Sequence, residues 1–201
     1  MNSNSGVRGS STLDRQFGHP TGLLGWLVGY AMALEHRSLH RAVIDHLALN
    51  QDDRVLEIGF GPGTAIRLAA LHAAHVSGID ISTEMVRQAL HRNHDAVRAG
   101  RVDLQKGTAS TLPYPDGSFT VVFEVNSFHH WDDQIQGIRE IQRVLRSGGK
   151  VMFTLRGSHS VPTASEVDGM VRLLEEEGLT VVATEEHSFE HGGAFVVARR
   201  A

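Results

Sequence analysis

The sequence predicts a doubly wound α/β fold, in which helices cover both faces of a mostly parallel, seven-stranded sheet. From residue 54 onward, short apolar runs alternate with segments of helical periodicity. These runs are apolar at almost every position, which is typical of strands covered on both faces. With 201 residues, the chain is long enough to bury one such core.

The predicted strands are short, and turn residues separate them from the helices. We expect strands at 54–58, 75–79, 102–105, 119–125, 150–155, 179–184 and 194–199. Helices are expected at 64–74, after Ser82 as N-cap, from Ile135 to Leu145 with a stop at Ser147 to Gly149, and at 166–177. No long crossover separates the last two strands, so we expect them to pair antiparallel.

Three regions follow from this pattern. Residues 1–16 are rich in Ser, Asn and Gly and are expected to form a flexible tail. Residues 17–50 are expected to form an N-terminal helical cap, with helices at 21–36 and 39–49. Residues 51–201 are expected to form the ligand-binding domain.

Composition excludes several classes of function. The chain has no cysteine, which excludes disulfides, thiolate metal sites and a cysteine nucleophile, and which fits the reducing cytoplasm. The net charge of −4 gives no basic field for nucleic acid. The longest apolar stretch, Leu23 to Leu34, is shorter than the ~20 residues of a membrane span, so we expect no stable membrane insertion. The same stretch could instead form a helix that lies on a membrane surface, and this alternative stays open.

A glycine-rich loop follows the first predicted strand in the segment LEIGFGPGTA, residues 56–65. Ligands of open α/β sheets bind beyond the carboxyl ends of the strands. Glycines let the main chain turn sharply and approach a ligand, and the following helix N-terminus offers N–H donors. Because Thr64 occupies the third position of G-x-G-x-x-G, the loop departs from a dinucleotide fingerprint. It also lacks the Gly-Lys-Ser/Thr of a phosphate loop.

The order of several segments resembles a known family. The pattern E-x-G-x-G-x-G at 57–63 resembles the first motif of class I S-adenosylmethionine-dependent methyltransferases, and Asp80 follows 17 residues after Gly63. The segments Leu112 to Phe119, His129 to Trp131 and Arg143 to Gly149 resemble the UbiE/Coq5-like branch (methyltransferase type 11). The resemblance spans residues 50–155 and implies the Rossmann-like methyltransferase fold and S-adenosylmethionine as cofactor.

The resemblance implies a role for each matching position. It assigns the methionine end of the cofactor to Glu57, Gly59, Phe60, Gly61 and Gly63. It assigns the ribose to Asp80, the adenine to Ile81, Thr108 and Ala109, and the surroundings of the sulfonium to Glu124 and Val125. Thr108 departs from the family, which often has Asp there, and Thr120 replaces a common Asp as an expected structural change.

Methyl transfer from a sulfonium mainly needs alignment, and a base is required only when the nucleophile arrives protonated. His129 is the candidate base, because it follows the fourth strand and histidine titrates near neutrality. The alternative is that 129–131 packs around the next helix. Tyr30, Trp131 and Trp26 are candidate contacts for the acceptor. For Trp26 and Tyr30 the alternative is a helix that simply packs on the sheet. No metal site is expected, because the pairs His36/His40 and His91/His94 lack a third ligand.

The sequence therefore predicts an S-adenosylmethionine-dependent methyltransferase that acts on a small-molecule or lipid-like acceptor. No nucleic-acid substrate is expected, because residues 124–128 lack the Asn/Asp-Pro-Pro-Tyr/Phe of amino-methyltransferases. A non-catalytic S-adenosylmethionine-binding module and, less favoured, a nicotinamide-dependent reductase are the alternatives. The loop after the fifth strand, at 156–165, is short, so we expect an acceptor site that is open or is completed by the N-terminal helices or by a partner subunit, and a homodimer stays possible.

Overall fold

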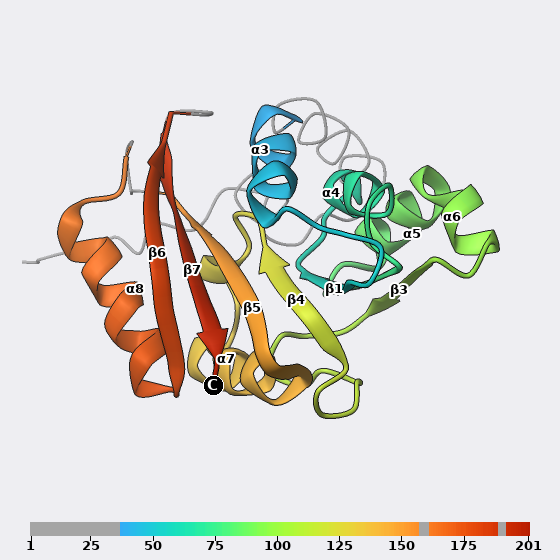
Figure 1. Ribbon diagram of the computed structural model, residues 1–201. Coiled ribbons are helices and arrows are strands. Elements are labelled where there is room, and N and C mark those ends of the chain that lie inside the picture. Colours follow the sequence, from blue (N-terminus) through green and yellow to red (C-terminus); the bar gives the residue numbers. More distant parts are fainter. Residues whose placement is uncertain (1–36, 157–160, 189–191) are drawn as a thin grey trace, which may run out of the picture.

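A computed structural model describes residues 37–156, 161–188 and 192–201. Within them the chain forms one twisted seven-stranded sheet of order β3-β2-β1-β4-β5-β7-β6 (Figure 1). Strands β3, β2, β1, β4 and β5 pair in parallel, and β7 lies antiparallel to both β5 and β6. The predicted fold class and the antiparallel last strand are thus confirmed. The predicted tail, the helix at 21–36, Trp26 and Tyr30 lie outside the described residues.

The strands lie close to their predicted positions. They are β1 Arg54–Ile58, β2 His75–Asp80, β3 Val102–Lys106, β4 Phe119–Glu124, β5 Leu145–Leu155, β6 Leu179–His187 and β7 Gly193–Arg200. Strand β4 is buried at all six positions, which explains its unbroken apolar run. At its start, the Thr120 hydroxyl donates to Asp53 Oδ1 at 2.7 Å and accepts from the Arg54 amide at 3.1 Å. Thr120 is therefore structural, as predicted.

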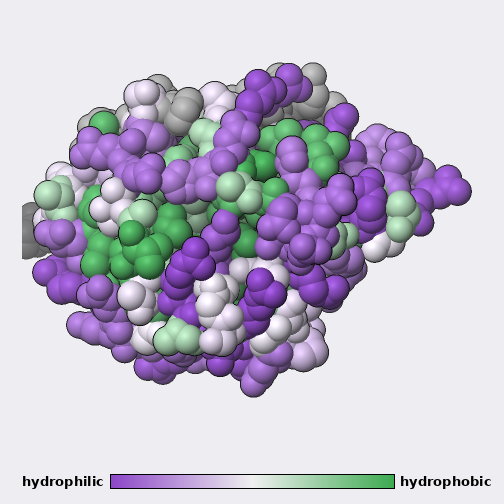
Figure 2. Space-filling model, viewed as in Figure 1, coloured by the Kyte–Doolittle hydropathy of each residue, from purple (hydrophilic) through white to green (hydrophobic). Residues whose placement is uncertain are grey.

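The helices divide the core into two layers. They are α3 Arg37–Leu47, α4 Thr64–Ala69, α5 Thr83–Arg92, α6 His94–Arg98, α7 Gln134–Val144 and α8 Ala164–Glu176, with a 3₁₀ turn at Phe128–His130. Side chains of α3, α4 and α5 form one apolar cluster with one face of the sheet. Those of α7 and α8 form the second cluster with the other face. On the side shown in Figure 2, hydrophilic residues surround the apolar areas that remain at the surface.

Several helix ends differ from prediction by a few residues, and three of the differences have identifiable reasons. Helix α4 ends at Ala69 rather than residue 74, because the amides of Ala74 and His75 donate to the Asp53 carbonyl and turn the chain into β2. Helix α3 ends at Leu47 rather than residue 49, where Ala48 takes the left-handed conformation with φ 45°.

Helix α7 ends at Val144 rather than Leu145, because Leu145 already pairs with Phe119 in the sheet. The register between β4 and β5 then shifts, and Lys150 is the next β5 residue paired with β4, opposite Val121. Ser147 to Gly149 therefore lie inside the irregular start of β5 and do not form the helix stop. No helix of the described residues is long and apolar enough to cross a bilayer.

Candidate active site

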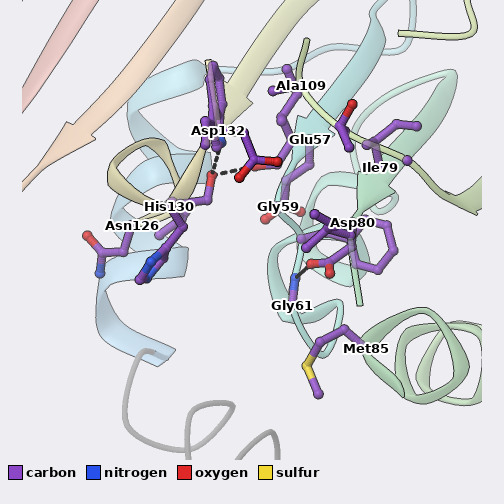
Figure 3. A pocket seen from close by; sticks show the side chains of 18 of the residues that line it. Glu57, Gly59, Gly61, Ile79, Asp80, Met85, Ala109, Asn126, His130 and Asp132 are labelled. Atoms are coloured by element: carbon purple, nitrogen blue, oxygen red, sulfur yellow. Dashed lines mark hydrogen bonds between the residues drawn. The ribbon is translucent and has the colours of Figure 1, made fainter. Parts of the chain in front are cut away.

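A cavity lies at the carboxyl ends of β1, β2 and β4, where the prediction places the ligand. Most of the predicted site residues line it: Glu57, Gly59, Phe60, Gly61, Asp80, Ile81, Thr108, Ala109, Val125 and Trp131. The cavity wall does not include Gly63, Glu124 or His129, and Tyr30 lies outside the described residues. Figure 3 shows the loop with Gly59 and Gly61 facing the side that carries Asn126 and His130.

The three loop glycines share a left-handed backbone but have different surroundings. Their φ angles are 74° at Gly59, 52° at Gly61 and 77° at Gly63. A Cβ on Gly59 would lie 2.3 Å from Ser127 Cβ, and one on Gly63 would lie 2.6 Å from Ala89 Cβ. A Cβ on Gly61 would meet nothing within 4 Å. Gly59 and Gly63 are therefore required by packing, whereas Gly61 borders the open cavity, where a ligand can approach the backbone.

Asp80 fixes this loop with its carboxylate. Its Oδ2 accepts the Gly61 amide at 2.8 Å, as the dashed line in Figure 3 marks, and its Oδ1 accepts the Ser82 amide at 2.8 Å. A carboxylate has about four acceptor sites, more than the two that these amides use. Asp80 can therefore hold the loop and accept ligand hydroxyl groups at the same time.

Glu57 places a second carboxyl group at the cavity, at 1% exposure. Its Oε2 is buried and has no hydrogen-bond partner in the described structure. Burial, and then the negative charges of Asp80 and Glu124, raise the pKa of Glu57 well above its usual value. A cationic ligand group at this position would both supply a donor to Oε2 and stabilise the ionised form.

The prediction for Glu124 needs correction, because its carboxylate turns into the protein. Oε2 accepts the amides of Ser127 at 2.7 Å and Phe128 at 2.9 Å, and Oε1 accepts the Thr154 amide at 2.6 Å. Burial raises the pKa of Glu124, and these donors oppose that rise. Glu124 therefore holds the loop after β4 in shape, and Val125 is the residue of the pair that reaches the cavity.

The prediction for His129 also needs correction, because the next residue lines the cavity instead. His130 and Trp131 are part of the cavity wall. The ring of His129 contacts that of His130, with the centroids 3.9 Å apart and the planes tilted by 45°. Desolvation, and then the positive charges of His130 and Arg156, lower the pKa of His129 to about 4. Such an imidazole is a weak base at neutral pH, so His129 is poorly suited to proton removal.

The cavity also contains residues that the sequence analysis missed: His40, Met85, Asn126 and Ser127. Asn126 and Ser127 directly follow the fourth strand, so the strand-end rule could have found them. His40 comes from α3, and no local pattern links that helix to the loops. In the described part of the chain, no three His, Asp or Glu side chains gather to hold a metal ion.

Comparisons with known proteins show which proteins this chain resembles. The family model described as "Methyltransferase domain" matches residues 56–153. The uncharacterized methyltransferase YdaC of Bacillus subtilis is 36% identical over 132 residues, which cover 65% of this chain and 71% of YdaC.

Two further similarities were found. The 27-O-demethylrifamycin SV methyltransferase of Amycolatopsis mediterranei is 39% identical over 138 residues, 68% of this chain and 50% of that protein. A SAM-dependent methyltransferase from Aquifex aeolicus superposes with a TM-score of 0.68 at 20% identity, covering 81% of this chain and 89% of the other. At this sequence identity, the similarity to the Aquifex aeolicus structure shows a shared fold alone.

Proposed function

The chain belongs to the methyltransferase domain family of S-adenosylmethionine-dependent enzymes, and from this premise we propose that it methylates an oxygen of a small hydroxylated molecule. The observation that carries the proposal is the division of one cavity into two chemically different sides. Glu57, Asp80 and a glycine loop form one side, with Asn126 and His130 across from them (Figure 3). Trp131 and the carboxylate of Asp132 also line the cavity.

The first side fits the cofactor at three points. Glu57 Oε2, buried without a partner, would accept from the ammonium group of the methionine moiety. Asp80, which Gly61 and Ser82 hold in place, would accept from the ribose hydroxyls. Ile81, Met85 and Ala109 offer apolar contacts for the adenine ring. The open space beside Gly61 leaves room for the ligand to contact the main chain.

The second side would bind and activate the acceptor. Bound S-adenosylmethionine supplies an electrophilic methyl group whose leaving group needs no acid. His130 lines the cavity and takes the place of His129 as the proposed base, accepting the proton of the acceptor hydroxyl. Trp131 packs its ring on Phe128 at 5.1 Å and donates its indole N–H to the Ser127 hydroxyl at 3.3 Å. These two contacts would hold the indole ring in place for an apolar acceptor to pack against it.

The class of acceptor is supported by both the cavity and a relative. The cavity joins an aromatic wall at Trp131 with a base, a combination that suits phenols and other hydroxylated ring compounds. The relative from Amycolatopsis mediterranei is named for methylation of 27-O-demethylrifamycin SV, a small molecule.

The proposal is tested by measuring S-adenosylhomocysteine formation from S-adenosylmethionine and a set of small phenols. We expect His130→Ala to lower turnover by about 10²–10⁴-fold at neutral pH while cofactor affinity stays unchanged. His129→Ala is the matched control and should change turnover by less than about threefold. Equal losses in both variants, or full activity of His130→Ala, would contradict the assignment of the base. Cofactor binding without any S-adenosylhomocysteine formation would favour a non-catalytic binding module.

A further inference from the structure

Asn126 has an unusual backbone conformation at the end of β4. Its φ angle is 53°, in the left-handed region that non-glycine residues seldom adopt, although Asn tolerates it best. Its amide donates to Thr154 Oγ1 at 2.7 Å, and the same hydroxyl lies 3.4 Å from its Oδ1. The oxygen end of the side chain therefore faces β5, and the Nδ2 end is left for another partner.

That other partner is missing from the described protein. Asn126 lines the cavity, and its Nδ2 is buried without a hydrogen bond. A buried amide without a partner destabilises a protein, so such groups in native structures call for an explanation. A ligand oxygen in the cavity would supply the acceptor that Nδ2 lacks.

The surrounding structure holds Asn126 in this strained position. Glu124, two residues earlier, accepts the amides of Ser127 and Phe128 and binds β5 through Thr154. The loop is thus anchored on both sides of Asn126. Backbone strain that neighbouring contacts enforce at a cavity is typical of a group prepared for a ligand.

The position of Asn126 assigns it to the acceptor side of the cavity. In Figure 3, Asn126 and His130 lie together on one side, across from Gly61, Asp80 and Met85. His130 follows Asn126 by four residues and lines the same cavity. A proton acceptor and a hydrogen-bond donor therefore stand next to each other, which favours an acceptor molecule with two neighbouring oxygens.

We propose that Asn126 is a specificity-determining residue whose Nδ2 donates a hydrogen bond to a second oxygen of the acceptor, adjacent to the hydroxyl that is methylated. This inference rests on the proposed function and narrows the acceptor class to molecules with vicinal oxygens, such as catechols and ortho-acyl phenols. The hydroxyl oxygen forms a bond to the methyl carbon, the carbon–sulfur bond breaks with its electron pair passing to sulfur, and the hydroxyl proton passes to His130. The second oxygen is unchanged by the reaction.

The test compares pairs of probes that differ only in the second oxygen: catechol with phenol, and 2,3-dihydroxynaphthalene with 2-naphthol. Binding is measured by calorimetry on protein saturated with S-adenosylhomocysteine, and turnover is measured with S-adenosylmethionine. Asn126→Gly removes the amide and suits the left-handed backbone, whereas Asn126→Asp keeps the shape and replaces the donor with an acceptor. Asn50→Asp is the matched control, because Asn50 is exposed at a turn and is far from Asn126 in the sequence.

We expect the wild type and Asn50→Asp to bind the vicinal member of each pair about tenfold more tightly than its partner. Both Asn126 variants should lose this preference, while their affinity for S-adenosylmethionine stays within about twofold. Absence of the preference in the wild type, or its persistence in Asn126→Gly, overturns the proposal. A loss of S-adenosylmethionine affinity in the Asn126 variants also overturns it, because Asn126 would then hold the cofactor. None of these results removes the proposed function, which fails if no phenol of the set is methylated.

Discussion

Gly59 and Gly61 have similar φ angles, 74° and 52°, but different neighbours. A methyl group on Gly59 would collide with Ser127, whereas one on Gly61 would project into the cavity. We expect Gly59→Ala to destabilise the protein by more than about 2 kcal/mol, from backbone strain and overpacking together. Gly61→Ala should cost only about 1–2 kcal/mol, from the strain alone, but should weaken cofactor binding strongly.

Urea unfolding and calorimetry with S-adenosylmethionine separate these two effects. Equal stability losses at the two glycines would show that the loop packs differently. Normal cofactor affinity in a folded Gly61→Ala variant would show that the ligand does not approach this part of the main chain.

Glu57 makes the stability of the ligand-free protein depend on pH. Its pKa in the folded state is raised above the value of 4.5, so the folded protein binds the proton more tightly than the unfolded chain. The free energy of unfolding should therefore fall as pH rises from about 4.5 through the raised pKa. Glu57→Gln should remove this part of the fall, and Glu124, whose pKa is also raised, should retain its own part.

Glu57→Gln should stabilise the ligand-free protein at neutral pH but weaken the binding of the cofactor. Glu57→Gln is expected to lower S-adenosylmethionine affinity by about tenfold or more, because a charge-assisted hydrogen bond is lost. Unfolding curves from pH 4 to pH 8, with Glu176→Gln at an exposed site as control, test the first effect, and calorimetry tests the second. A variant with an unchanged pH slope would contradict the buried position of the Glu57 carboxyl group.

At the scale of elements, Arg143 joins helix α7 to the segment that leads into β4. Its guanidinium donates to Glu140 on the same helix, to the carbonyls of Leu112 and Tyr114, and to Asp116. Hydrogen bonds to these carboxylates raise the pKa of Arg143, which stays charged. The segment Leu112 to Phe119, which identified the family in the sequence, is thus a structural strap that positions β4.

Arg143→Lys keeps the charge but loses the fork of donors, so we expect a stability loss of about 1–3 kcal/mol. Arg139→Lys on the same helix is the control. Arg139 pairs with Glu177 while 58% of its side chain is exposed, and such an exposed ion pair contributes little to stability. Chemical denaturation measures the stability of both variants. Equal stability losses would contradict the role of Arg143 in holding the segment Leu112 to Phe119 against helix α7.

The strands were easier to predict than the ends of the helices. Arg54–Ile58 matches its prediction, because a buried parallel strand reads as one apolar run between turn residues. Leu145 was misassigned because its apolar side chain continues the helical pattern, while its backbone pairs with Phe119, a contact that local sequence does not encode. His129 was likewise chosen as the base in place of His130, because the sequence does not show which ring of a short 3₁₀ turn faces the cavity.

At the scale of the whole molecule, the family resemblance predicted the cavity because its parts come from strand ends that the parallel topology brings together. Glu57 is next to last in β1, Asp80 ends β2 and Val125 follows β4, and these three strands are neighbours in the sheet. His40 could not be predicted in the same way, because it reaches the cavity from α3, before the first strand. The link between that helix and the cavity exists only in three dimensions.

Because the cofactor side joins several strand ends, ligand binding should stabilise the whole fold. At a concentration of about 100 times Kd, a ligand that binds only the folded state adds about 2.7 kcal/mol. For a chain of this length we expect S-adenosylmethionine to raise Tm by about 5–10 °C. Differential scanning fluorimetry measures this shift, and NADH at the same concentration is the control. An equal shift with NADH would contradict the assignment of the cavity.

The most direct test is a crystal structure of the protein bound to S-adenosylhomocysteine. We expect the ribose hydroxyls within hydrogen-bond distance of the Asp80 carboxylate, the amino group beside Glu57 Oε2, and the sulfur facing Val125 and His130. A nucleoside bound elsewhere, or one whose ribose has no contact with Asp80, would contradict this assignment of the cavity.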